Sequence, residues 1–114
     1  MNISVCDFGS SKVIDDTNIL NVPRIVARIY RPPELVFAHS CYDTSVDMWS
    51  IGCIILELFL LKPAFEGKTD GHMFFEFCQL LGTPSKAICK ELMEGLPQDL
   101  VTKLMSYVNE NKIE

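Results

Sequence analysis

The strongest constraint on the fold is the stretch from Ser45 to Leu61, which is apolar at most of its positions. An ordinary surface helix has one apolar stripe, whereas these side chains would point to all sides of a helix. Thr44 is expected to cap the first turn, with Asp47 three residues on as in a capping box, and Pro63 follows the end. A helix that is apolar all round must be covered on every side, so we expect it at the centre of a packed domain.

Helical patterns continue after this stretch. Thr69 or Asp70 can cap a second helix that ends at Gly82. Thr83, followed by a proline, can cap a third helix, and Pro97 can open a last one. The expected inner faces of these helices are Met73, Phe77, Leu80 and Leu81; Ile88 and Leu92; and Leu100, Val101, Leu104, Tyr107 and Val108. The pattern therefore predicts a mainly α structure, with later helices over residues 70–114.

The N-terminal part of the sequence has a different pattern. Residues 1–6 are expected to form a short strand, because Ile3 to Cys6 alternate as strand residues do. From Ser10 to Arg31 the sequence shows no helical period and many turn residues, which predicts a long loop. Pro32 and Pro33 can open one helical turn where this loop ends.

Composition limits the class of protein. The length of 114 residues fits one domain, and 48% hydrophobic with 22% charged residues is typical of a globular chain. A net charge of −5 gives no indication of a nucleic-acid or anionic-membrane partner. The five cysteines lack metal-type spacing, which favours reduced thiols in an intracellular protein. The longest apolar run, residues 51–61, contains Glu57 and is too short to span a bilayer.

Three motifs occur in order, and together they are far more specific than any one of them alone. They are Asp7-Phe8-Gly9 after the expected strand, the segment from Arg28 to Glu34, and the segment from Asp47 to Cys53. In this order and spacing the chain resembles the protein kinases of the CMGC group. The stretches that most resemble the glycogen synthase kinase 3 (shaggy) branch are Cys6 to Lys12, Phe65-Glu66-Gly67 and Leu80 to Pro84.

The resemblance implies a fold and an activity. The fold would be an incomplete helical C-lobe of the protein-kinase domain over residues 1–114, with the activation segment at 7–34 and the central buried helix at 45–61. The activity would be transfer of the ATP γ-phosphoryl group, with Mg²⁺, to Ser or Thr of a protein substrate.

The resemblance also assigns roles to single residues. Asp7 would hold Mg²⁺, because a hard cation prefers carboxylate oxygen, and Phe8 and Gly9 would support it. Glu34 would anchor the end of the activation segment through an ion pair. Asp47 would accept hydrogen bonds from the catalytic-loop backbone, although its position fits a helix cap equally well. Trp49 would pack in the interior.

Basic and aromatic residues carry the remaining roles. Arg28 and Arg31 would bind an anion and shape the substrate-binding loop, because the guanidinium fork matches phosphate. Lys12 would help to bind a phosphate on the substrate, or it is a solvated surface lysine. Phe75 on the second helix is either a core residue or a contact for a scaffold-protein helix.

Several kinase parts do not occur in this sequence. It has no Gly-rich loop and no His-Arg-Asp motif, and its lysines all lie at or after Lys12. Ala27 stands where active relatives have a hydroxyl residue, and Arg24 stands where the resembling branch has a tyrosine. We therefore expect the isolated chain to be inactive as a kinase. The alternatives are a non-catalytic interaction module derived from a kinase and a truncated relic.

Overall fold

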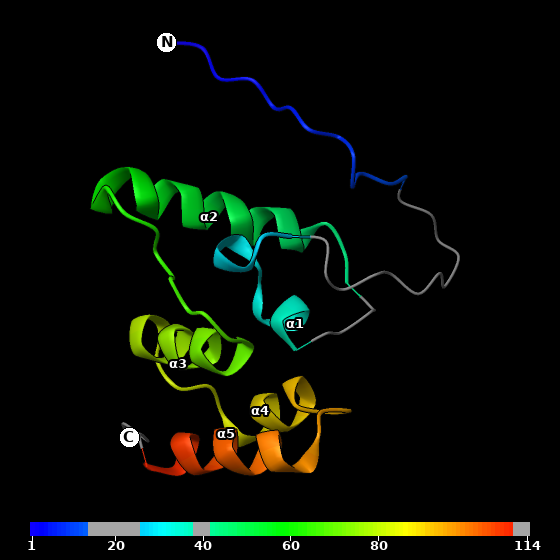
Figure 1. Cartoon of the computed structure of the whole chain (residues 1–114), viewed down its shortest axis with the longest axis vertical. Coiled ribbons are helices and arrows are strands. Elements are labelled where there is room, and N and C mark those ends of the chain that lie inside the picture. Colours follow the sequence, from blue (N-terminus) through cyan, green and yellow to red (C-terminus); the bar gives the residue numbers. More distant parts are fainter. Residues whose placement is uncertain (14–25, 38–41, 111–114) are drawn as a thin grey trace.

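The computed structural model describes residues 1–13, 26–37 and 42–110, except for the side chain of Tyr107. These residues form helices and loops, with no strand among them. The elements in chain order are the 3-10 helix η1 (Arg28–Tyr30) and the α-helices α1 (Pro33–Val36), α2 (Ser45–Leu60), α3 (Asp70–Leu81), α4 (Lys86–Leu92) and α5 (Gln98–Glu110). Figure 1 shows α2 across one end of the helical body, η1 and α1 next to it, and α4 and α5 at the other end.

The expected strand at residues 1–6 is absent, and this prediction was wrong. Ile3 and Val5 are 92% and 82% exposed, and Figure 1 shows this segment leading away from the helices. A strand is stable only when its backbone pairs with a neighbour. Among the described residues, no segment lies beside residues 1–6 to pair with them.

Helix α2 begins with a different cap from the one predicted. Thr44 makes no side-chain capping hydrogen bond, and the carboxylate of Asp43 instead accepts from the backbone N–H of Ser45 at 2.8 Å. The Ser45 side chain and this backbone bond together lower the pKa of Asp43, because both stabilise its charged form. The C-cap of the helix is Leu61, whose backbone is left-handed (φ 57°) and whose N–H donates to the carbonyl of Glu57 at 2.8 Å. The predicted helix is therefore confirmed, with its cap moved by one residue.

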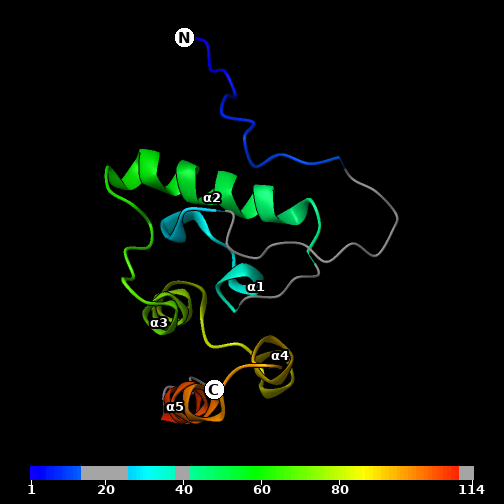
Figure 2. The same ribbon diagram turned by 45° about the vertical axis from the view of Figure 1, so that its right-hand side comes forward.

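The burial expected for α2 on all sides is not found among the described residues of this chain. Within this helix, all of which the structure describes, Val46 and Cys53 are buried. Its exposed apolar side chains are Met48, Ile51, Ile54, Ile55, Leu56, Leu58, Phe59 and Leu60. Figure 2, a turned view, shows the elements next to α2 all lying on one side of it. The composition of a helix indicates how much of its surface can be buried, but the elements that pack against it decide how much is buried.

A first hydrophobic core joins α2 to α3. This α2–α3 core consists of Val36, Cys53, Phe65, Met73 and Phe77, with Tyr30, Trp49 and Ala64 packed against it. The indole ring of Trp49 stacks on Phe65 with ring centroids 6.0 Å apart, and Phe77 meets both rings edge-on at 5.2 and 4.8 Å. Trp49 is therefore a packing residue, as expected from the sequence.

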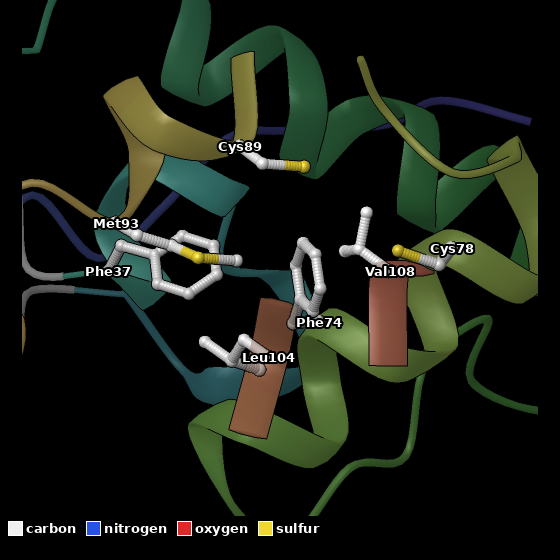
Figure 3. Packing of buried hydrophobic residues seen from close by; sticks show 7 residues of the cluster. All are labelled: Phe37, Phe74, Cys78, Cys89, Met93, Leu104 and Val108. Carbon is white, nitrogen blue, oxygen red and sulfur yellow. The ribbon is translucent and has the colours of Figure 1, made fainter. Parts of the chain in front are cut away.

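A second hydrophobic core fills the space between α1, α3, α4 and α5. This α3–α5 core consists of Phe37, Phe74, Cys78, Cys89, Met93, Leu104 and Val108. Figure 3 shows these side chains converging, and the rings of Phe37 and Phe74 meet edge-to-face at 5.4 Å. Leu100 and Val101 pack against this core from α5, so the predicted inner face of the last helix is confirmed for its described side chains.

The predicted inner faces of α3 and α4 were only partly right. Met73 and Phe77 are buried, but Leu80 and Leu81 are 52% and 61% exposed because α3 has a second buried face toward α4 and α5. On α4, Ile88 is 50% exposed, and the fully buried residue is Cys89 next to it. The residues that replace them inside are Phe74, Cys78, Cys89 and Met93.

The predicted caps of α3 and α4 had different outcomes. The Thr69 side chain accepts from the backbone N–H of His72 at 3.1 Å, so the predicted cap of α3 is confirmed. The cap of α4 is Ser85 and not Thr83, because the Ser85 hydroxyl accepts from the N–H of Ile88 at 3.4 Å. Within the residues described above, no helix is both long and apolar enough to cross a membrane.

Candidate functional site

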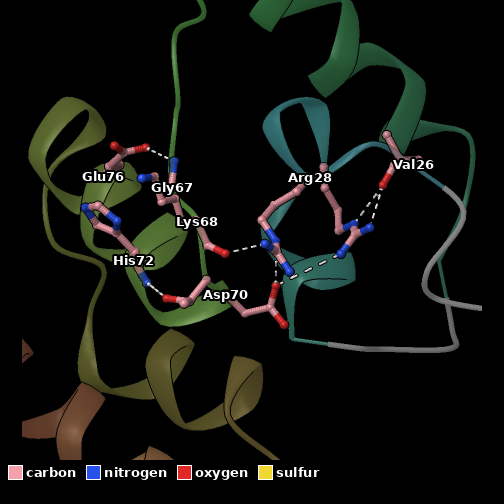
Figure 4. Close-up of polar contacts among 9 residues, drawn as sticks. Val26, Arg28, Gly67, Lys68, Asp70, His72 and Glu76 are labelled. Carbon is pink, nitrogen blue, oxygen red and sulfur yellow. Dashed lines mark hydrogen bonds and ion pairs between the residues drawn. The ribbon is translucent and has the colours of Figure 1, made fainter.

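The polar cluster of interest lies between η1 and the start of α3, and Figure 4 shows it. The Arg31 guanidinium donates two hydrogen bonds to the carbonyl of Val26, at 2.9 and 2.6 Å, and a terminal nitrogen of Arg28 donates to the carbonyl of Lys68. Both arginines also face one carboxylate oxygen of Asp70, at 3.5 Å from Arg28 and 4.0 Å from Arg31. The structure thus brings together two predicted anion-binding residues and an internal carboxylate.

Helix η1 is fixed to α2 on its other side. The Tyr30 hydroxyl donates to the carboxylate of Glu57 at 2.6 Å, and the Ser50 hydroxyl donates to the carbonyl of Tyr30 at 2.9 Å. The hydrogen bond to Glu57 raises the pKa of Tyr30, since it is made only by the neutral phenol. Because η1 is tied to α2 and its arginines reach α3, the segment 26–37 bridges the two helices.

The loop before α3 is held by a carboxylate from α3 itself. Glu76 accepts from the backbone N–H groups of Glu66 and Gly67, at 2.7 and 3.0 Å. Gly67 has no room for a side chain, because a Cβ there would lie 2.7 Å from the backbone nitrogen of Met73. The loop conformation places Asp70 in the first turn of α3, where the helix dipole favours a negative charge.

Sequence reasoning considered Asp70 only as a helix cap and missed its contact with the arginines. The available signal was a carboxylate at a helix start in a chain whose three arginines all lie within residues 24–31. That signal is weak, because it does not say which helix start lies near the arginines.

The expected magnesium residue is separate from this cluster. Asp7, Phe8 and Gly9 are all exposed, and Asp7 has a left-handed backbone with φ 64°. In the described part of the chain, no group of three or more His, Cys, Asp or Glu could hold a metal ion. Asp7 alone does not make a magnesium–nucleotide site, so we derive no catalytic step through Mg²⁺ or ATP from this structure.

Other predicted site residues are dispersed. Glu34 is half-buried and forms no ion pair with a described residue, and Asp47 is exposed on α2. The Lys12 ammonium lies 5.9 Å from the ring centre of Tyr42, before the start of α2. Phe75 is half-buried on α3, with its ring 6.3 Å from that of His72. Arg24, which stands where the resembling branch has a tyrosine, lies outside the described residues.

Comparisons with known proteins agree with the motifs and the helical order. A profile of the protein kinase domain family matches residues 1–112. The protein kinase gsk31 of Schizosaccharomyces pombe is 45% identical over 83 residues, which are 73% of this chain and 22% of that protein. The chain belongs to the protein kinase domain family. ATP is the phosphoryl donor of this family.

Further relatives come from other fungi. Glycogen synthase kinase 1 of Pyricularia oryzae is 42% identical over 84 residues, covering 74% of this chain and 21% of that protein. The serine/threonine-protein kinase RIM11/MSD1 of Saccharomyces cerevisiae is 42% identical over 85 residues, covering 75% of this chain and 23% of that protein. The predicted likeness to the glycogen synthase kinase 3 branch of the CMGC group is therefore confirmed.

A solved structure supports the fold. A chain in the CAK complex from Chaetomium thermophilum, bound to ATP-gamma-S, superposes with a TM-score of 0.66 at 29% identity. The match covers 76% of this kinase-family chain and 28% of that chain. The predicted helical C-lobe is thus confirmed for the part of the kinase fold that the chain covers. The chain spans about a fifth of the length of the curated relatives that it matches.

Proposed function

We propose that this chain is a portion of a serine/threonine protein kinase and supplies its activation-segment and substrate-side surface, without catalysing phosphoryl transfer alone. The observation that supports this role most is the docking of segment 26–37 on α2 and α3, with Arg28 and Arg31 gathered at one point. In this proposal the arginines bind an anion and Lys12 assists with a phosphate on the substrate. Glu34 anchors the end of the activation segment through an ion pair, Asp47 accepts hydrogen bonds from the catalytic-loop backbone, and Trp49 packs in the interior.

The proposed lack of activity follows from what phosphoryl transfer needs. The reaction depends on positioning the nucleotide and neutralising its charge, with a base near the accepting hydroxyl. The sequence has no His-Arg-Asp motif, Asp7 is exposed, and the described chain has no group of three or more His, Cys, Asp or Glu that could hold a metal ion. ATP, Mg²⁺ and a protein substrate would bind only when the remaining kinase parts are supplied. We propose an intracellular setting, with no nucleic-acid or membrane partner.

A chimera tests this proposal. Residues 7–85 of the chain would replace the matching stretch of gsk31, and phosphorylation of a generic protein substrate would be measured for the chimera and for the isolated chain. We expect no activity from the isolated chain, and activity from the chimera that is lost with Asp7→Ala. Because Ala27 stands where active relatives have a hydroxyl residue, Ala27→Thr should raise the activity of the chimera.

Two results would contradict the proposal. Activity of the pure isolated chain that Asp7→Ala abolishes would show that it is a complete catalyst. A folded chimera that remains inactive with Ala27→Thr would show that this chain does not supply a working kinase surface.

The second candidate function is a non-catalytic interaction module. The exposed apolar side of α2 favours it, because contiguous apolar surface is where partners commonly bind. The half-buried Phe75 on α3 would be a contact for an amphipathic scaffold helix. A helical peptide whose binding weakens about tenfold with Phe75→Ala, but not with Phe59→Ala, would support the α3 contact. If the Phe75→Ala variant binds the peptide as tightly as the wild type does, the α3 contact is excluded.

A further inference from the structure

The two arginines next to α3 point toward a single oxygen atom. The side chain of Arg31 is 10% exposed, that of Arg28 is 38% exposed, and that of Asp70 is 27% exposed. Both arginines face the same Oδ1 atom of Asp70 (Figure 4). A position shared by two guanidinium groups is one that an oxygen of a phosphate group would also occupy well.

Backbone carbonyls hold both guanidinium groups in place. The carbonyl of Val26 accepts two hydrogen bonds from Arg31, and the carbonyl of Lys68 accepts one from Arg28. The nitrogens that face Asp70 are others, Nε of Arg28 and Nη1 of Arg31. A neutral carbonyl thus helps to orient each arginine, and Asp70 provides negative charge at the point where they meet.

The sequence around η1 offers no covalent source of that negative charge. No Ser, Thr or Tyr occurs from residue 18 to residue 29, so a phosphate cannot be attached to a side chain in that stretch. Two adjacent cations without a counter-ion would repel each other and weaken the docking of η1. A carboxylate from another element removes this repulsion.

We propose that Asp70 is a built-in counter-ion that occupies a phosphate-type oxyanion site formed by Arg28 and Arg31. It holds the segment 26–37 against α3 without a bound phosphate. Removal of its charge opens the same site to an external phosphate group. This inference deepens the proposed function, because it concerns the anion-binding role of the same two arginines.

Hydrogen exchange of the full chain tests the inference, with inorganic phosphate as the probe. Asp70→Asn removes the charge and nearly keeps the shape. In chloride we expect the amides of Tyr30 and Arg31 to exchange about three- to tenfold faster in this variant than in the wild type. In phosphate at the same ionic strength we expect their protection to return. Phosphate can slow exchange slightly over the whole chain. In the wild type, the amides of Tyr30 and Arg31 should gain no more protection from phosphate than the rest of the chain does.

Asp99→Asn is the matched control. Asp99 also lies in the first turn of a helix, α5, but forms no ion pair with a described residue. The control should show the same small phosphate response as the wild type, which separates the arginine site from a helix-dipole effect. Adding Arg28→Gln to Asp70→Asn should abolish the local recovery in phosphate.

Three results would overturn the inference. One is a wild-type chain that gains local protection from phosphate as strongly as Asp70→Asn, since the site would then be open already. Another is an Asp70→Asn variant with unchanged exchange in both salts. The third applies if Asp70→Asn is unfolded in chloride: the inference is then overturned if phosphate restores its structure no more than it stabilises the core variant Phe74→Ala. None of these measurements uses ATP, so they succeed or fail independently of the chimera assay.

Discussion

Helices α2 and α3 are both rich in apolar residues but have very different surroundings. Helix α3 packs on two sides, with Met73 and Phe77 in the α2–α3 core and Phe74 and Cys78 in the α3–α5 core. Among the described residues, helix α2 packs on one side only, and Phe59 on its open side is 83% exposed. In α3 the packing elements follow closely in the chain, whereas the described neighbours of α2 lie on the side of η1, α1 and α3 (Figure 2).

This difference shows which part of the kinase fold is self-contained in this chain. The α3–α5 core is built from residues 37–108, and its members Cys89 on α4 and Val108 on α5 are both 0% exposed. The open side of α2 has no such neighbours among the described residues. We therefore expect stability to depend on α3, and association between molecules to depend on α2.

The largest expected effect compares two phenylalanines. Phe74→Ala removes a ring that is 2% exposed in the α3–α5 core, and it should lower the free energy of unfolding by about 3–5 kcal/mol. Phe59→Ala removes a ring from the open side of α2 and should change it by less than about 0.5 kcal/mol. Denaturant unfolding followed by circular dichroism measures both. Equal losses would mean that α2 is covered in solution.

The next effect compares two glycines, one in each environment. Gly67→Ala would force a Cβ to within 2.7 Å of the backbone of Met73 and should cost about 1–3 kcal/mol. Gly52→Ala on α2 would meet no atom within 4 Å and should stabilise the chain by about 0.5–1 kcal/mol, because alanine favours the helix. Thermal unfolding measures whether each substitution raises or lowers the stability of the chain. A destabilising Gly52→Ala would indicate a neighbour close to that side of α2.

The smallest expected effect is a loss of stability in alkali. Burial in the α3–α5 core raises the pKa of Cys78 from 9.0 to about 11. The thiol is neutral when protonated, and its pKa is higher in the folded chain than in the unfolded chain. Its contribution to the free energy of unfolding is therefore complete below about pH 9 and is lost as the pH rises toward 11. The raised pKa of Tyr30 acts in the same direction.

Unfolding measured from pH 8 to 11 tests the alkaline loss. Cys78→Ala should flatten the pH dependence, whereas Cys6→Ala at an exposed position should leave it unchanged. A steep alkaline loss that survives in Cys78→Ala would place its origin elsewhere in the chain.

Much of the fold could be predicted from local signals. Thr69 as a helix cap, Pro97 at the start of α5, and the helical register of Leu104 and Val108 are all local properties of the sequence. The exposure of Ile88 was missed because neighbouring apolar residues give two possible inner faces. Only the position of the packing partners selects one of them.

The arrangement of the site was less predictable. Arg28 and Arg31 were identified through a motif, but their ion pairs with Asp70 join segments about 40 residues apart in sequence. Local pattern cannot show which loop lies next to which helix start. The prediction of a strand at residues 1–6 was wrong for the same reason, because strand formation depends on a partner outside the segment.

The most direct test of one-sided packing compares two adjacent positions on α2. Cys53 is 3% exposed and faces the α2–α3 core, whereas Ile54 is 49% exposed. Labelling of Ile54→Cys with a maleimide, followed by mass spectrometry of the peptides, reports both thiols in one molecule. The account predicts fast labelling at position 54 and slow labelling at Cys53. Slow labelling at both positions, in a dilute monomeric sample, would contradict the open side of α2.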